Sequence, residues 1–142
     1  MRRLLPLILL LPSCLPTDGT RMRPKPSVVV DVSERRMFVD GTPYRASTAR
    51  RGTGNVPGSK KTPIGTFVVV DKWTWGDPDY HGRISGPKLH LAGADCPASR
   101  RIYVHKGKTS GNYSLGCVHL SERDMHDVFA KVPVGSRVTI KP

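Results

Sequence analysis

A series of short runs rich in β-branched residues, each bounded by glycine, proline or aspartate, constrains the fold of this chain most strongly. The chain holds 14 glycines and 13 prolines in 142 residues, which suits many short strands better than a helix bundle. Asp40-Gly41 is a hairpin turn signal, so the first three runs predict an antiparallel meander. The expected strands are Ser27–Asp31, Arg36–Val39, Thr42–Ala46, Thr66–Asp71, Lys88–Leu91, Arg101–His105 and Val138–Ile140.

One segment near the C-terminus has the features of a helix. Ser121 is a favourable N-cap, and Glu122 and Asp124 follow it in the first turn, where acidic side chains are stabilised. Pro133 predicts the end of the helix. We therefore expect a mainly β fold, a sandwich or barrel with one short helix whose apolar face holds Met125, Val128 and Phe129.

The first residues, MRRLLPLILLLPSCLP, indicate export. Two arginines precede an apolar run that is too short to cross a bilayer, as in a secretory signal peptide. Cys14 ends a segment that resembles a lipoprotein cleavage box, with lipidation of Cys14 and plain cleavage as the two alternatives. We expect a signal peptide at 1–14, a linker at 15–26, a folded domain at 27–142, and a location in the periplasm or cell envelope.

The net charge of +12 favours anionic partners. The basic residues are scattered in pairs, and no recognition helix, zinc finger or aromatic-basic strand accompanies them. Because these motifs are missing, we do not expect nucleic acid to be the partner. An anionic cell envelope would attract the same positive charge.

The stretch VHKGKTSGNYSLGCVHLS, residues 104–121, combines residues that suit thiol chemistry. His105 ends an expected strand, and Cys117 follows a glycine- and serine-rich loop. An imidazole that lies beside a thiol can take its proton and produce the nucleophilic thiolate. This stretch therefore predicts a nucleophile in Cys117 and a base in His105.

The residues just before Cys117 suit the stabilisation of an oxyanion. Gly116 permits a tight turn, and the N–H groups around Leu115, Gly116 and Cys117 form a candidate anion nest. Ser114 has two candidate roles, orienting this loop or binding substrate.

Two other arrangements of the cysteines remain open. Once Cys14 is set aside, Cys96 and Cys117 form a candidate disulfide pair in an exported protein. Together with His105 and His119 they are also candidate zinc ligands, although their spacing matches no compact zinc pattern. We expect no metal or cofactor.

The sequence SLGCVHL resembles the S-x-G-C-(V/I)-x-L signature of L,D-transpeptidases, the YkuD-type catalytic domain. Four more segments resemble that family in the same order along the chain. They are the opening hairpin Val28–Gly41, the TPIGTF segment from Thr62, Gly86-Pro87 with the strand that follows it, and the closing PVGSRVTI strand from Pro133.

The resemblance implies a mechanism and a substrate class. Cys117 attacks the bond before the terminal D-Ala of a peptidoglycan tetrapeptide stem, and His105 acts as base and then as acid. A thioester forms on Cys117, and its acyl group then passes to an amine, which is a stem diamino acid, a protein lysine or a free D-amino acid. Ser114, Leu115, Gly116 and His119 are implied to bind the oxyanion or the substrate. Two alternatives remain: an L,D-carboxypeptidase that uses water, and a non-catalytic wall-binding lipoprotein anchored to the membrane through Cys14.

Three positions depart from residues that are common in the family. Lys106 replaces a frequent glycine and leaves no side-chain acceptor beside His105, so a main-chain carbonyl has to orient that ring. Leu115 replaces a histidine or arginine but leaves the backbone donors in place. His119 replaces a frequent arginine, so a permanent cation becomes one that titrates.

Overall fold

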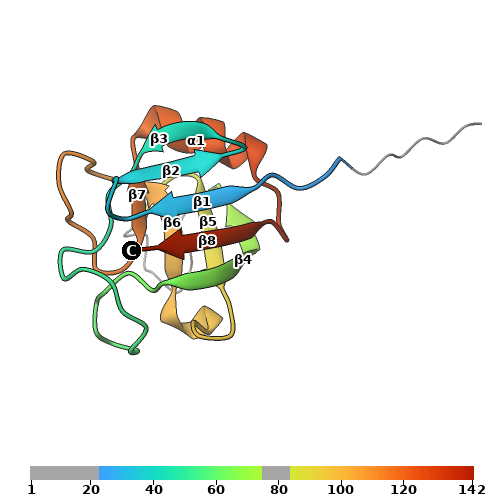
Figure 1. The fold of residues 1–142 in the computed structure, drawn as a ribbon. Helices are drawn as coiled ribbons and strands as arrows, with labels where there is room; N and C mark the ends of the chain where they lie inside the picture. The colour runs from blue at the N-terminus through green and yellow to red at the C-terminus, as the bar shows by residue number, and fades with distance from the viewer. Residues whose placement is uncertain (1–22, 75–83) are drawn as a thin grey trace, which may run out of the picture.

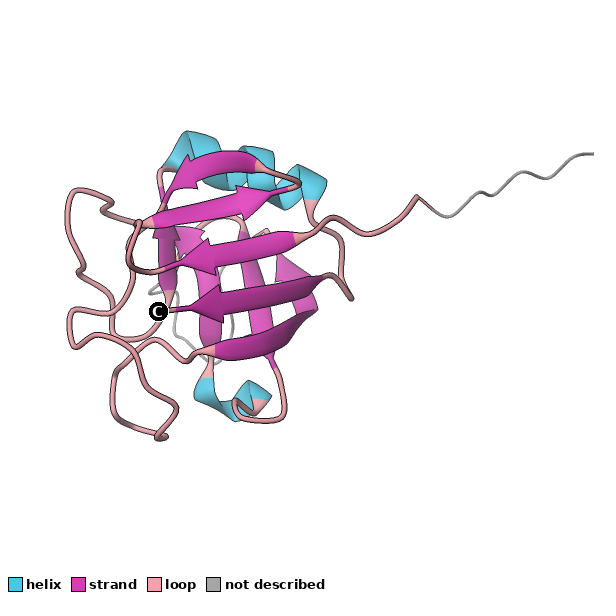
Figure 2. Ribbon diagram, viewed as in Figure 1, coloured by secondary structure: helices cyan, strands magenta, loops and turns pink. Residues whose placement is uncertain are grey.

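The computed structural model describes residues 23–74 and 84–142, which fold into an eight-stranded sheet and an α-helix (Figures 1 and 2). A 3₁₀ turn, η2 (Ala98–Arg100), precedes the sixth strand. The strands are β1 (Val28–Asp31), β2 (Arg36–Val39), β3 (Thr42–Arg45), β4 (Gly65–Trp73), β5 (Lys88–Ala92), β6 (Ile102–Lys106), β7 (Val118–Leu120) and β8 (Arg137–Lys141), and the helix is α1 (Glu122–Lys131).

The sheet curls into a nearly closed barrel. Its strand order is β3-β2-β1-β8-β4-β5-β6-β7, and Figure 1 shows β5, β6 and β7 running steeply behind the first five strands. The two edges approach each other where Ser47 pairs with His119 and Ala49 pairs with Ser114. This arrangement confirms the expected mainly β sandwich or barrel.

The first hairpins form as the turn residues predict. Asp40 and Gly41 both have positive φ, at 47° and 81°, which is the conformation of a tight hairpin turn. β1 pairs with β2 and β2 with β3, all antiparallel. Pro43 lies in β3, which is an edge strand of the sheet. No strand pairs with the open side of β3, so proline, which lacks an N–H group, is tolerated there.

The helix begins and ends at the residues that its caps predict. Ser121 Oγ accepts a hydrogen bond from the Asp124 N–H at 3.2 Å, and the helix ends at Lys131, before Pro133. Met125 and Val128 are buried, and the helix packs against β5 and β6. The helix therefore supports the two strands nearest the cysteine loop.

Strand β7 was not among the strands expected from the sequence. This strand has three residues between Cys117 and the helix cap, and it pairs in parallel with β6. A strand this short has no measurable alternation of its own, so only the tertiary pairing reveals it.

The expected signal peptide at 1–14, with Cys14, lies outside the described residues. Among the helices of the described ranges, none is long and apolar enough to cross a membrane.

The strands β5, β6 and β7 have two distinct faces because side chains alternate along a strand. One face contributes Leu89, Leu91, Val104, Val118 and Leu120 to the main hydrophobic core. The opposite face contributes Tyr103 and Cys117 to a second, smaller buried cluster with Ile84. Cys117, the candidate nucleophile, therefore lies on the side of these strands that faces away from the main core.

We predict that Ser121→Ala lowers the free energy of unfolding by about 1 kcal/mol, because it removes the N-cap acceptor of α1. Ser121→Asp is the matched control, since aspartate caps equally well and suits the positive end of the helix dipole. Urea denaturation measures both. Equal stability of Ser121→Ala and the wild type would show that the cap carries no net stabilisation.

Candidate active site

The register of three neighbouring strands places six polar or reactive side chains in two rows on one face. Lys88, His105 and His119 are directly opposite one another across β5, β6 and β7. His90 and Tyr103 form the next row, and Cys117 continues it immediately before β7. His105 and Cys117 thus share a face, on adjacent strands and in adjacent rows.

The imidazole of His105 is held in one tautomer. Its Nδ1 is 2.8 Å from the main-chain carbonyl oxygen of Lys106. A carbonyl only accepts, so Nδ1 carries the proton and Nε2 of the neutral ring has the free lone pair. Lys106 thus supplies the main-chain carbonyl that this position requires. Burial, with smaller contributions from the charges of His119 and Lys88, lowers the pKa of His105 to about 4, and the Lys106 carbonyl acts in the opposite direction.

The thiol of Cys117 is buried, with 8% of the residue exposed. Its Sγ accepts a hydrogen bond from the Tyr103 N–H at 3.4 Å and donates to the Arg101 carbonyl at 3.7 Å. Burial raises the pKa of the thiol to about 11, although the Tyr103 N–H acts in the opposite direction. The free protein therefore holds a neutral thiol and a neutral imidazole.

The turn before Cys117 is tied together by Ser114. Its Oγ donates to the Cys117 carbonyl at 2.5 Å and accepts from the Gly116 N–H at 3.2 Å, so the Gly116 donor is already used. The N–H groups of Leu115 and Cys117 have no partner among the described residues. Gly116 has φ +129°, and a Cβ there would lie 3.1 Å from Ile102 Cδ1, so glycine is required.

His119 stands edge-on against His105, with ring centroids 4.6 Å apart. Gly107 also packs closely on His119, so that a Cβ at position 107 would lie 2.5 Å from His119 Cγ. The Nδ1 atom of His119 is buried without a hydrogen-bond partner. Burial lowers the pKa of His119, partly offset by the Lys108 carbonyl, so this side chain is neutral at pH 7.

Sequence reasoning missed Lys88, His90 and Tyr103 as neighbours of the site. Lys88 is fully buried, and its ammonium donates to the Ile84 carbonyl at 3.0 Å. The ring centroids of His90 and Tyr103 are 4.7 Å apart. The alternation K-L-H-L from Lys88 was a usable signal, because polar residues at every second position of a buried strand mark a polar face.

The two other cysteine arrangements are not formed. Cys96 and Cys117 are both free and buried, so the candidate disulfide is absent. Within residues 23–74 and 84–142, no three His, Cys, Asp or Glu side chains are grouped closely enough to share a metal ion.

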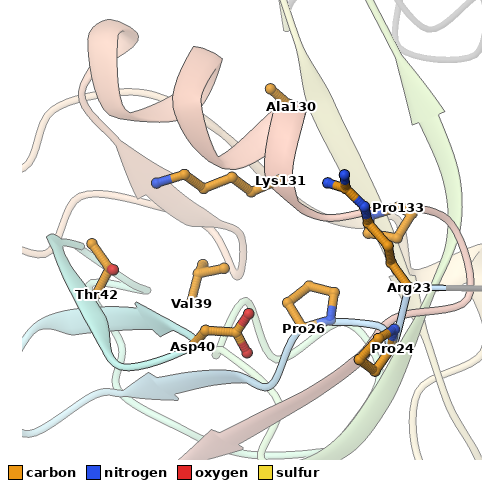
Figure 3. Close-up of a pocket in the computed structure, with 9 residues that line it drawn as sticks. All are labelled: Arg23, Pro24, Pro26, Val39, Asp40, Thr42, Ala130, Lys131 and Pro133. Atoms are coloured by element: carbon orange, nitrogen blue, oxygen red, sulfur yellow. The ribbon is translucent and has the colours of Figure 1, made fainter.

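Two cavities differ in their relation to the cysteine. One of about 600 Å³ lies between the N-terminal segment, the β2–β3 turn and the end of α1, as Figure 3 shows with Arg23 and Lys131 on its rim. It includes no residue of β6, of β7 or of the loop between them, so it is remote from the thiol chemistry. A second, of about 400 Å³, is lined by Ile102 and Leu115, which adjoin the Cys117 turn.

The fold agrees with that of several known structures. An L,D-transpeptidase from Mycobacterium tuberculosis H37Rv has a TM-score of 0.64 and 22% identity, over 84% of this chain and 58% of that one. L,D-transpeptidase 3 of the same species, solved with a faropenem-derived adduct, has a TM-score of 0.64 and 21% identity over 84% and 61%. The Xylanimonas cellulosilytica enzyme has a TM-score of 0.59 and 20% identity over 84% and 64%. The chain thus spans about three fifths of the length of these structures.

The sequence profile of one family covers most of the chain. No curated protein sequence matches this chain. Residues 25–140 match the profile of the YkuD family, the L,D-transpeptidase catalytic domain. That span includes both His105 and Cys117, together with the strands that bring them to one face. The chain belongs to the L,D-transpeptidase catalytic domain family.

Proposed function

We propose that the chain is a cysteine-dependent acyltransferase that acts on peptidoglycan stem peptides. His105 Nε2 takes the thiol proton while Cys117 Sγ attacks the carbonyl carbon before the terminal D-Ala. The C–N bond then breaks, the imidazolium returns the proton to the leaving amine, and a thioester remains on Cys117. The observation that carries this proposal is the fixed His105 tautomer, which leaves Nε2 free on the face that Cys117 shares.

Two main-chain donors support the oxyanion of this reaction. The unpaired N–H groups of Leu115 and Cys117 flank the turn at Gly116, so they suit the charge that develops as Sγ attacks. Ser114 stabilises the turn rather than the substrate, because its hydroxyl is engaged on both sides. His119 fixes the outer side of the His105 ring.

The acceptor decides between the reactions that this site supports. An amine attacks the thioester carbon, the C–S bond breaks and the thiol is restored. The candidate amines are a stem diamino acid, a protein lysine and a free D-amino acid. Water in the same place makes the chain an L,D-carboxypeptidase. We place this activity in the cell envelope, with Cys14 as the candidate lipid attachment site, and the wall-binding lipoprotein without turnover stays the alternative.

Substitution of the two central residues tests the chemistry. We predict that Cys117→Ala lowers turnover of a tetrapeptide stem roughly 10⁴-fold or more, and that His105→Ala lowers it about 10²–10⁴-fold. Cys96→Ala is the matched control, because Cys96 is the other buried free thiol among the described residues and its removal should leave turnover intact. Mass spectrometry with the stem, or with faropenem, should find an adduct on Cys117 alone. Turnover by Cys117→Ala would exclude the mechanism.

The buried, neutral thiol predicts how the rate of Cys117 alkylation depends on pH. With a thiol pKa near 11, the thiolate fraction rises about tenfold per pH unit from pH 7 to pH 10. We therefore expect slow alkylation of Cys117 by iodoacetamide at pH 7 and a steady increase without a plateau, read by peptide mapping. A plateau below pH 7 would indicate a preformed thiolate–imidazolium pair and would contradict the buried, neutral arrangement.

A further inference from the structure

A basic pocket adjoins the turn that carries Cys117. It is the cavity of about 400 Å³ noted above, and it lies between the loop after β3, the 3₁₀ turn η2 and the cysteine loop. These three segments are distant in sequence, but Arg100 joins the first two through hydrogen bonds to the carbonyls of Asn55 and Lys61. We name this cavity the basic pocket; its principal lining residues are Pro57, Lys60, Pro97, Arg100, Ile102 and Leu115.

The charge of the basic pocket is of one sign. Lys60 and Arg100 line it, and no acidic residue does. Lys60 makes no ion pair within the described ranges, and its side chain is exposed. The guanidinium of Arg100 donates to the Asn55 and Lys61 carbonyls and also bonds to the Cys96 thiol. These bonds fix it and leave part of its five N–H donors for a ligand. Such a pair of cations suits an anion.

The backbone around the basic pocket is strained. Lys60 and Arg101 have φ of 59° and 53°, in the left-handed region that non-glycine residues rarely adopt. Lys60 lies in the pocket wall, and Arg101 lies between two further residues of that wall, Arg100 and Ile102. Strain of this kind persists where the surrounding structure holds it, and it concentrates at ligand sites.

The pocket also has an apolar side that touches the active site. Leu115 is 65% exposed, an unusual exposure for a large apolar residue beside a nucleophile. Ile102 lies between Arg101 and Tyr103, whose main-chain groups bond to Cys117 Sγ, and its Cδ1 packs against Gly116. A ligand that occupies the pocket therefore contacts Leu115 and Ile102, the two apolar residues that adjoin the cysteine turn.

We propose that the basic pocket binds a carboxylate of the peptidoglycan stem peptide, with the adjoining alkyl part of that residue against Leu115, while the acyl group is transferred at Cys117. This inference rests on the proposed function. Stem peptides combine carboxylates with short apolar side chains, and the pocket offers an exposed ammonium, a braced guanidinium and an apolar wall. Lys60 and Arg100 are then specificity residues that separate acidic stems from amidated ones.

Paired substrates test this specificity. The full chain is given tetrapeptide stems in which each free carboxylate in turn is replaced by a carboxamide, and kcat/KM is measured. One amidation should lower kcat/KM about tenfold, the size of one charge-assisted hydrogen bond. Lys60→Gln should remove that discrimination, and Lys60→Arg should restore it. Arg123→Gln, which removes the same charge from an exposed position on α1, should leave it unchanged. Equal use of every stem by the wild type, or a uniform loss with Lys60→Gln, would overturn the proposal.

A binding measurement separates this inference from the proposed function. In the full chain with Cys117→Ala, the acidic stem should shift the amide resonances of Gly58, Lys60 and Leu115, and the critical amidated stem should not. Discriminating binding without an adduct on wild-type Cys117 would sustain the pocket and reject the acyltransferase. An adduct on Cys117 without discrimination between stems would sustain the acyltransferase and reject the pocket.

Discussion

The parallel pairing of β6 with β7 is the constraint on which the rest of the site depends. It places His105 opposite His119 and brings Cys117 beside Tyr103. The thiol and both imidazoles, which lie at the two ends of the loop between β6 and β7, therefore share one face. A shift of one residue in this register would turn Cys117 toward the main core and Val118 toward the polar face. The helix α1 secures the pairing, because only its N-cap, Ser121, separates it from β7, and because it packs against β5 and β6.

The polar face of these strands and the turn before Cys117 are largely buried in spite of their polar side chains. Lys88 and Ser114 are buried, and each donates to a main-chain carbonyl, which offsets the cost of removing them from water. The same burial raises the pKa of Cys117 and lowers the pKa of His105. Neutral forms of both groups therefore dominate in the free protein, and in the mechanism proposed above charge develops only when Cys117 attacks. A preformed ion pair would have to be desolvated at a larger cost.

Much of this fold could be predicted from local sequence signals. The Asp40-Gly41 turn, the Ser121 cap and the longer strands form where short-range preferences place them. The strand β7 could not be predicted, because its three residues acquire strand geometry from β6 and from the segment after β3. Lys88 was missed for a related reason. A lysine in a strand usually faces water, and only the register shows that this one lies beside His105. The site motif around Cys117 was visible, but the protonation of its thiol depends on burial, which no short motif contains.

Gly107 carries a consequence for how this site can change over evolutionary time. Its missing side chain makes the space in which the His119 ring lies, since a Cβ at 107 would overlap Cγ and Nδ1 of that ring. Positions 107 and 119 are therefore coupled. A larger residue becomes acceptable at 107 only after 119 has become small or has turned away, and the reverse order passes through a clashing intermediate. Mutational libraries that randomise the two positions together should recover functional pairs that single-site scans of either position never sample.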